Sequence, residues 1–442
     1  MELRKYLGKG IWGLADKALP VVYGLGFVLL VIRVLPEEEF GNFVLVQEIF
    51  LIITGLATAL ALQPLLKFAS EQDNSATTAV GSVLPLYCGF LILTSLVIVT
   101  VREMVAQVLN APALSALLLY LPGMLAASLI RNLTLVLLQA RFRIKEVFWV
   151  DALHFLGAPF LVWVWSRMHR FDSALDLILI NILSLSASSL VGLIVTRFTM
   201  RWSLRATAGE YRKIWDYGKF SAGGVTTYLM YSKADTFLLS AFAGPVPVAV
   251  YNAAKVFTRV FEMLTQVVQM FVLPATSRLS SRRDADSLQA LVEKSITFST
   301  IGMLPVLLLF LLAPGLLIGI LYGGRYAGAI PILRIFAGLA LGVPLYSVGS
   351  NVLLGLGEAR ANFHLGLQML FISLACYIVL IPPLGGEGAA LAYVAATVLI
   401  AISTAFTVHR YVPLSLRRLI RRERDIRMFI MTYFRKQDPT GM

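Results

Sequence analysis

Charged residues are scarce in this chain of 442 residues. Asp, Glu, Lys and Arg together make up only 14% of the sequence, whereas hydrophobic residues make up 58%. A soluble domain carries about 25% charged residues, so this composition excludes an ordinary soluble protein and predicts an integral membrane protein. The formal net charge of +13 could indicate nucleic-acid binding, but that interpretation requires a basic face on a soluble module. We therefore expect membrane lipids, and no nucleic acid, among its partners.

Cysteine and histidine are also rare, which argues against metal and disulfide chemistry. The two cysteines, Cys88 and Cys376, each lie within an apolar run, and the four histidines are scattered. The sequence also lacks the phosphate-binding motif GxxxxGK[ST], the zinc motif HExxH and the nucleophile motif GxSxG. We therefore expect no enzymatic activity, no metal site and no cofactor other than a coupling ion, H⁺ or Na⁺.

Long apolar runs dominate the chain. A membrane-spanning helix needs about 20 mostly apolar residues, and these runs are continuous, without the alternation of period two that β-barrel strands show. The pattern predicts an all-α membrane protein with about twelve transmembrane helices. Asp16 and Lys17 interrupt the first run, which is also too long for a signal peptide, so we expect it to remain as a span. The predicted spans are 11–34, 42–66, 79–100, 112–139, 147–166, 175–197, 217–243, 248–274, 296–321, 328–354, 362–383 and 388–409.

The distribution of basic residues predicts the orientation. If the N-terminus is cytoplasmic, 26 of the 38 lysines and arginines fall in segments on the cytoplasmic side, and only 5 fall in loops on the other side. Because cytoplasmic loops of membrane proteins carry an excess of Lys and Arg, this asymmetry favours a multi-pass protein of the cytoplasmic membrane with both termini inside.

The basic loop near residues 197–216 divides the predicted spans into two sets of six. Each set opens with a similar short turn that contains proline and is followed by an aromatic residue. A duplicated six-helix unit is a common transporter plan, with the binding site near the midplane between repeats. The basic end of the chain has apolar residues at helical spacing, which suits a helix on an anionic membrane surface. The predicted parts are a six-helix bundle (1–200), a basic linker (201–216), a second six-helix bundle related by pseudo-symmetry (217–410) and a basic amphipathic cytoplasmic tail (411–442).

Several stretches, taken in order, resemble the polysaccharide-exporter branch of the multidrug/oligosaccharidyl-lipid/polysaccharide (MOP) superfamily. The first, Arg33-Val-Leu-Pro-Glu-Glu-Glu-Phe-Gly41, is similar to that family's Leu-Gly-Pro-Glu-Glu-Phe-Gly-type turn after the first helix, although the glycine before Pro36 is missing. The resemblance implies a flippase that translocates a polyprenyl-diphosphate-linked oligosaccharide for O-antigen, capsule or exopolysaccharide synthesis, with a polysaccharide polymerase and glycosyltransferases as candidate protein partners. The other similar stretches are 235–254, 272–280, 321–333, 353–360 and 382–392.

Cationic residues within the predicted spans suit such a substrate. A diphosphate headgroup crosses hydrocarbon only at high cost, and cationic side chains in a cavity lower that cost. An ionisable residue inside a span is therefore a functional hypothesis by default, with snorkelling side chains or salt bridges between helices as the alternative. In related flippases, cations on the first and the seventh or eighth helices line a central cavity, which favours Lys17, Lys233 and Arg259. The full candidate set is Lys17, Arg131, Lys233, Lys255 and Arg259.

Acidic residues in or near the spans allow two interpretations. Asp16, Glu48, Asp151, Asp235 and Glu262 could carry a coupling ion, or they could be salt-bridge partners of the cations. Cationic neighbours in sequence favour salt bridges for Asp16 and Glu262, and Asp235 is the preferred coupling candidate.

Three other functions compete with a flippase. A multidrug or cation antiporter of the same fold would need a net acidic cavity, whereas the residues within the spans are mostly cationic. A membrane-embedded polymerase or ligase usually has a large outside loop, and the outside loops here are short. A scaffold without transport activity is compatible with the sequence.

Overall fold

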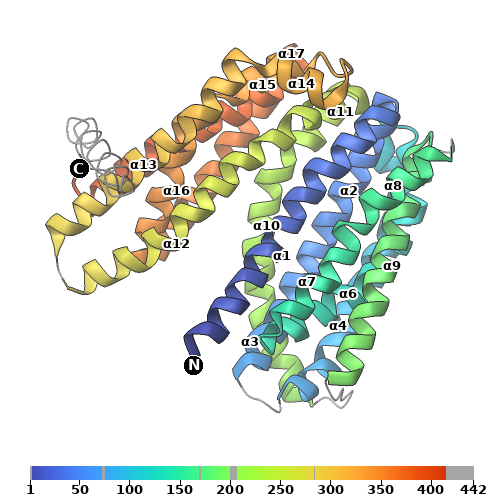
Figure 1. Ribbon diagram of the computed structural model, residues 1–442, viewed down its shortest axis with the longest axis horizontal. Helices are drawn as coiled ribbons and strands as arrows, with labels where there is room; N and C mark the ends of the chain where they lie inside the picture. Colours follow the sequence, from blue (N-terminus) through green and yellow to red (C-terminus); the bar gives the residue numbers. More distant parts are fainter. Residues whose placement is uncertain (1, 72–74, 169–170, 200–206, 283, 415–442) are drawn as a thin grey trace, which may run out of the picture. The chain divides into compact units, whose positions relative to one another are not determined.

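The computed structural model is built almost entirely of helices, and it describes residues 2–71, 75–168, 171–199, 207–282 and 284–414 (Figure 1). Most of the predicted tail, from residue 415 onward, and residues 201–206 of the predicted linker lie outside the described residues. The elements are α1 (Glu2–Val34), α2 (Glu37–Ala57), the π-helix η1 (Thr58–Leu62), α3 (Gln63–Glu71), α4 (Ser75–Val108), α5 (Leu114–Leu117), the 3-10 helix η2 (Leu118–Tyr120), α6 (Leu121–Ala140), α7 (Ile144–Phe155), α8 (Gly157–Arg167), α9 (Ala174–Thr199), α10 (Ala208–Ala243), α11 (Pro245–Lys255), the 3-10 helix η3 (Val256–Thr258), α12 (Arg259–Ser281), α13 (Ala285–Leu312), α14 (Pro314–Tyr322), α15 (Ala329–Phe336), α16 (Leu339–Gly355) and α17 (Ala359–His409).

The helices confirm the prediction of an all-α membrane protein. Within the described residues, eight helices are long and apolar enough to cross a membrane, or nine if α15 and α16, which meet at a bend of 43°, form one span. Every stretch predicted as a span lies mostly on helices, although α1, α10 and α14 do not belong to this set. The 51-residue α17 covers the last two predicted spans. Its backbone is non-helical at Gly385, which divides it into two helical parts, one for each span.

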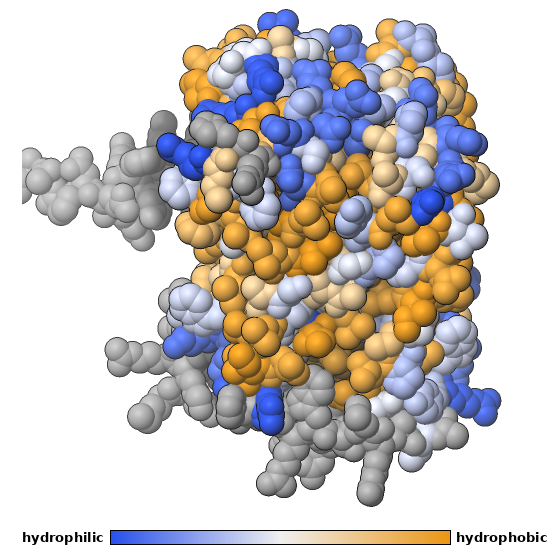
Figure 2. Space-filling model, turned by 90° about the vertical axis from the view of Figure 1, so that its right-hand side faces the viewer, coloured by the Kyte–Doolittle hydropathy of each residue, from blue (hydrophilic) through white to orange (hydrophobic). Residues whose placement is uncertain are grey.

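Large apolar side chains cover much of the outer surface. Figure 2 shows a broad apolar face with hydrophilic residues gathered at one end. Ile92 and Leu96 of α4, Phe160 of α8 and Leu190 of α9 are each about 60% exposed. Apolar patches of this extent are unfavourable in water and match the hydrocarbon region of a bilayer.

The chain forms two compact units. Unit 1 consists of residues 1–256 and 319–326, and unit 2 consists of residues 257–318 and 327–442. The contacts therefore place α10 and α11 with the first half of the chain, whereas the sequence predicts that these helices open the second bundle. The physical reason is the close packing of α10 and α11 against α2 and η1.

Two glycines bring helix backbones into contact in unit 1. A Cβ atom on Gly41 of α2 would lie 2.0 Å from the carbonyl oxygen of Pro245 at the start of α11, and one on Gly218 of α10 would lie 2.0 Å from the carbonyl oxygen of Leu60 in η1. The first contact lies at the end of unit 1 that contains α11, and the second lies toward the end that contains α3 (Figure 1). Glycine at these positions sets the helix spacing, as small residues do in membrane bundles.

Unit 2 uses the same device between α16 and α17. A Cβ atom on Gly342 would lie 2.9 Å from the carbonyl oxygen of Thr397 in α17. A Cβ atom on Gly349 would lie 2.3 Å from the Thr404 side chain of the same helix. Gly355 of α16 similarly abuts Leu273 and Thr276 of α12. Small residues therefore position the helices of unit 2 as well.

Substituting Gly218 by alanine should destabilise the protein by about 1–3 kcal/mol, because the added methyl group overlaps the Leu60 carbonyl group and forces α10 away from η1. Gly223→Ala, on the same helix, is the control. Nothing lies within 4 Å of its Cβ position, and alanine is the better helix former by roughly 0.5–1 kcal/mol. Unfolding curves in detergent would check both variants, and equal stabilities for the two would contradict the close contact at Gly218.

Candidate functional site

An ion pair joins α2 and α10 inside unit 1. The Nζ atom of Lys233 lies 2.6 Å from Oε2 of Glu48, and the two side chains are 22% and 12% exposed. Glu48 is one of the predicted acidic candidates, and Lys233 is one of the predicted cations. Because both side chains keep some exposure, this pair is partly hydrated, and a competing anion would displace Glu48 more easily than it would separate a fully buried pair.

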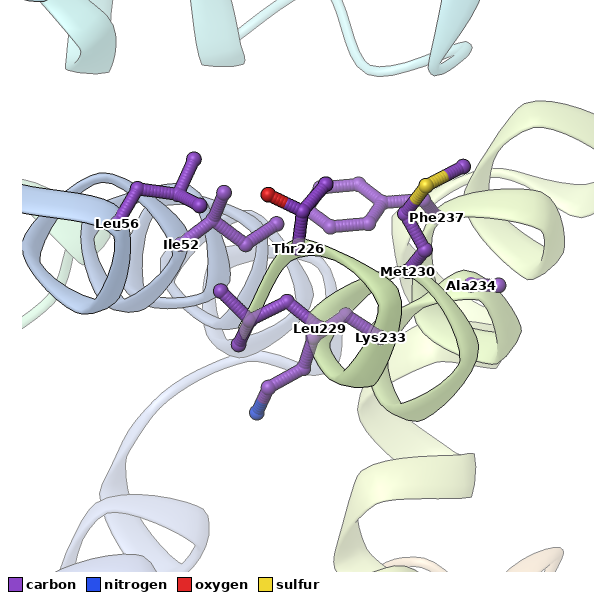
Figure 3. Close-up of a pocket in the computed structure, with 8 residues that line it drawn as sticks. All are labelled: Ile52, Leu56, Thr226, Leu229, Met230, Lys233, Ala234 and Phe237. Atoms are coloured by element: carbon purple, nitrogen blue, oxygen red, sulfur yellow. The ribbon is translucent and has the colours of Figure 1, made fainter. Parts of the chain in front are cut away.

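A cavity of about 200 Å³ lies beside this ion pair. Figure 3 shows Ile52 and Leu56 of α2 next to residues of α10, with the Lys233 nitrogen extending away from Thr226 and Phe237. The aliphatic stem of Lys233 therefore forms part of an apolar wall while its charge reaches Glu48. Since ligand pockets usually measure about 300–1,000 Å³, this cavity could hold only part of a large amphiphile. Its lining residues are Ile52, Leu56, Thr226, Leu229, Met230, Lys233, Ala234 and Phe237.

A second ion pair joins α10 to α11. Asp235 is fully buried, and its Oδ2 atom lies 2.5 Å from Nζ of Lys255 and accepts a hydrogen bond of 2.6 Å from the Tyr251 hydroxyl group. Its Oδ1 atom accepts a hydrogen bond of 2.7 Å from the backbone N–H of Thr236. Residues two apart on a helix point to nearly opposite sides, which is why Asp235 faces α11 while Lys233 faces α2. With both oxygens occupied, Asp235 fixes α10 against α11.

A third cluster brings together α1, α6 and α7. Arg131 of α6 forms an ion pair with Asp151 of α7, and its guanidinium group also lies 5.3 Å from the centre of the Phe155 ring. Asp16 of α1 is buried next to Asp151, close enough for the two carboxyl groups to interact. One oxygen of Asp16 has no hydrogen-bond partner within the described part of the chain. The cluster therefore contains two carboxyl groups and one arginine.

Buried polar groups extend this cluster. Nδ1 of His154, one turn from Asp151 on α7, lies 3.0 Å from the Ser184 hydroxyl group of α9, and the Tyr23 hydroxyl group of α1 donates to Asn181 of α9 at 3.2 Å. Asp151 is one of the predicted acidic candidates, whereas the other groups are not among the predicted site residues. For His154, the signal that could have indicated it was its spacing from Asp151 on one helix face.

The remaining predicted site residues are less buried. Lys17 of α1 is exposed, and its charge acts on Asp151 of the third cluster. Arg259 is half-buried and Glu262 is exposed, and both belong to unit 2. The structure therefore brings the predicted candidates together as the pairs Lys233–Glu48 and Lys255–Asp235, and as the neighbours Arg131 and Asp16 around Asp151. In the described residues, no group of three or more His, Cys, Asp or Glu side chains could hold a metal ion.

A protein family and two individual proteins resemble this chain in sequence. Residues 30–331 match the model of a family described as polysaccharide biosynthesis protein. An uncharacterized membrane protein of Methanocaldococcus jannaschii is 28% identical over 181 residues, which cover 41% of this chain and 36% of that protein. The probable low-salt glycan biosynthesis flippase Agl15 of Haloferax volcanii is 23% identical over 230 residues, or 50% of this chain and 48% of the relative. The matches thus span about a third to a half of each relative's length.

Solved structures share the fold. An inward-facing multidrug resistance MATE-family transporter of the MOP superfamily superposes with a TM-score of 0.73 at 16% identity, over 90% of this chain and 98% of the transporter. The lipid II flippase MurJ in an inward closed conformation superposes with a TM-score of 0.72 at 13% identity, over 90% and 87% of the two chains. The fold is therefore that of the MOP superfamily, and the chain belongs to the polysaccharide biosynthesis protein family.

Proposed function

We propose that this protein is a flippase that moves a polyprenyl-diphosphate-linked oligosaccharide repeat unit across the cytoplasmic membrane by alternating access. Its product would serve the synthesis of O-antigen, capsule or exopolysaccharide. Family membership, the name of the Haloferax relative and the cations inside the apolar helices support this proposal. The positive-inside asymmetry supports the orientation with both termini in the cytoplasm.

The position of Lys233 is the observation that carries the proposal. It is half-buried, it lines the cavity formed by residues of α2 and α10, and it forms an ion pair with Glu48 of α2. A substrate diphosphate carries more negative charge than Glu48 and would compete with it for the ammonium group. Exchange of one anion for another avoids the cost of an unpaired lysine in the apolar interior.

The other cations in the candidate set would act differently. Lys255 and Arg131 are held by Asp235 and Asp151, so they maintain helix packing in unit 1. Lys17 and Arg259 remain proposed headgroup ligands from α1 and α12. A polysaccharide polymerase and glycosyltransferases are the proposed partners, because they would consume and supply the lipid-linked oligosaccharide.

Energy coupling is proposed for the cluster around Asp16. Asp16 and Asp151 lie side by side in the apolar interior, with Arg131 as the cation bonded to Asp151. Arg131 is the buried cation that faces the two carboxyl groups, and Lys17 adds a second positive charge from an exposed position. The Asp16 oxygen without a hydrogen-bond partner in the described part of the chain is the proposed place for uptake of one proton or binding of Na⁺. This arrangement also favours a second function, cation antiport by a MATE-like mechanism, because an acidic site attracts cations.

Flipping measured in proteoliposomes tests the proposal. A fluorescent polyprenyl-diphosphate oligosaccharide should be translocated, and Lys233→Ala should slow translocation by about ten- to a hundredfold, because a charge-assisted hydrogen bond is worth roughly 1.5–3 kcal/mol. Lys233→Arg should retain most of the activity, since it keeps the charge.

Lys219→Ala is the matched control for Lys233→Ala. Lys219 lies on the same helix but is exposed and pairs with Asp216 at the surface, so its loss should leave the rate unchanged. A cationic dye provides the comparison with antiport. Movement of the dye without movement of the lipid, or full activity of folded Lys233→Ala, would reject the flippase proposal.

A further inference from the structure

A short segment from the second half of the chain packs with unit 1. Residues 319–326, here called the strap, comprise the end of α14 and the turn that follows it. The chain leaves unit 2 after Ile318, contributes the strap to unit 1, and rejoins unit 2 at Ala327. Apart from the strap, unit 1 is built from residues 1–256. The contacts of the strap are therefore a point at which the second half of the chain is tied to the first.

Two arginines fasten the strap to the end of α1. Arg33, in the last turn of α1, donates from Nε to the carbonyl oxygen of Leu321 and from Nη2 to that of Ile320, both at 2.9 Å. Arg325 in turn donates from Nη1 to the carbonyl oxygen of Arg33 at 2.8 Å. The last carbonyl groups of a helix have no partner within that helix. Arg33 therefore binds carbonyl groups at the end of α14, and Arg325 binds a carbonyl group at the end of α1. All three bonds lie near the surface.

Two buried tyrosines also attach the strap to unit 1. Tyr322 is buried, and its hydroxyl group donates to the carbonyl oxygen of Ala253 in α11 at 2.8 Å. The Tyr326 ring is also buried and meets the Phe40 ring of α2 edge-on, with 6.3 Å between the ring centres. The strap thus contacts α1, α2 and α11 near the turns that the sequence predicts on the outside of the membrane.

The backbone of the strap has an unusual conformation. Gly323, Gly324 and Tyr326 all have positive φ angles, of 64°, 83° and 62°. Glycine adopts this region freely, whereas a tyrosine does so only when its surroundings hold it there. The buried hydroxyl group of Tyr326 also has no hydrogen-bond partner among the residues that the structure describes. Undocking would relieve both costs, because the backbone could relax and water could bind the hydroxyl group. The strap is therefore strongly held and strained at the same time.

We propose that the strap is a releasable latch on the outward end of unit 1. It is docked while that end is closed, and it is released when the end opens to discharge substrate. Two glycines beside a strained tyrosine allow the change of backbone angles, and the surface arginine bonds are the first to separate. This inference rests on the proposed alternating access, but the contacts involve no residue of the proposed binding site.

Labelling of a buried cysteine tests the release step without any substrate. In a protein with Cys88→Ser and Cys376→Ser, the variant Ala253→Cys places a thiol at a fully buried position whose carbonyl oxygen binds the Tyr322 hydroxyl group. A membrane-impermeant maleimide is added from outside. Arg33→Ala should raise the labelling rate about tenfold, which corresponds to the loss of two ordinary hydrogen bonds. Arg102→Ala is the matched control, since Arg102 lies in another turn predicted outside and has its neighbour Glu103 as its ion-pair partner. Equal labelling rates for Arg33→Ala and the control would overturn the latch.

Crosslinking tests whether release is needed for turnover. With the same cysteine replacements, Arg33→Cys and Arg325→Cys are joined by a short, thiol-cleavable bismaleimide. Flipping should stop when the crosslink forms and resume after cleavage, which also shows that the protein is folded. Unchanged flipping by fully crosslinked protein would overturn the latch and leave the flippase proposal intact. Conversely, the wild-type protein could flip no lipid while Arg33→Ala is labelled faster than Arg102→Ala. That result would refute the proposed substrate and support the latch.

Discussion

Replacing Asp235 by alanine should lower the free energy of unfolding by about 3–5 kcal/mol, because the variant leaves the Lys255 ammonium group without its carboxylate in the interior of unit 1. The same substitution removes the acceptor of the Tyr251 hydroxyl group. Denaturant or thermal unfolding of the protein in detergent would measure the loss. The loss should exceed that of Lys233→Ala, whose partner Glu48 lies in a less buried pair.

The double variant Asp235→Leu with Lys255→Met separates the two parts of this effect. Replacing a buried ion pair by apolar residues of similar volume is often neutral or stabilising, so the double variant should recover most of the stability that Asp235→Ala loses. Its coupling energy should be well above the 1 kcal/mol typical of surface pairs. If Asp235→Ala unfolds like the wild-type protein, then Asp235 does not fix α10 against α11, and its role as a coupling residue becomes the better explanation.

The pairing of charges explains why such residues occur in an apolar chain. Lys233, Lys255 and Arg131 each have a carboxylate partner from a different helix. An unpaired charge in the membrane interior is expensive, so the partner must come from a neighbouring helix. Of these pairs, Lys233–Glu48 adjoins the cavity and contains the most exposed cation, with its side chain 22% exposed, and it is therefore the pair best suited to exchange partners.

The architecture could be predicted from the sequence because hydrocarbon imposes a simple rule. Each apolar run of sufficient length must form a helix, and the ranges predicted for spans all lie mostly on helices. Gly338 and Gly342 also follow the GxxxG spacing, and both pack closely against α17. The boundary between the last two spans was predictable as well, since the backbone break at Gly385 falls between the predicted spans 362–383 and 388–409.

The partners of the charged residues could not be predicted in the same way. On a continuous helix, the i, i+4, i+7 spacing of Lys255, Arg259 and Glu262 would place them on one face. In the structure, Lys255 instead pairs with Asp235, twenty positions earlier, and a 3-10 segment separates it from Arg259. Partner choice depends on which helices become neighbours, and a sequence contains no direct measure of that. For the same reason, the sequence places Asp151 among the acidic candidates but does not identify Arg131 and Asp16 as its partners.

Asp16→Asn should preserve the fold and abolish the dependence of flipping on a proton gradient. Asparagine has nearly the same shape as aspartic acid but carries no titratable proton, and the ion pair between Arg131 and Asp151 remains. Flipping in proteoliposomes with and without an imposed pH gradient would measure the effect, with unfolding curves to confirm stability. We expect the gradient to accelerate the wild-type protein and to leave the variant at the rate seen without a gradient.

Asp151→Asn is the companion variant, because it changes the same kind of group in the same cluster. It removes the partner of Arg131, so it should lower the free energy of unfolding by about 3–5 kcal/mol, whereas Asp16→Asn should change it by less than 1 kcal/mol. Retention of full gradient dependence by Asp16→Asn would exclude this residue as the proton carrier. If instead both variants are unstable, then the two carboxyl groups support Arg131 together, and the coupling ion must bind at another place in the protein.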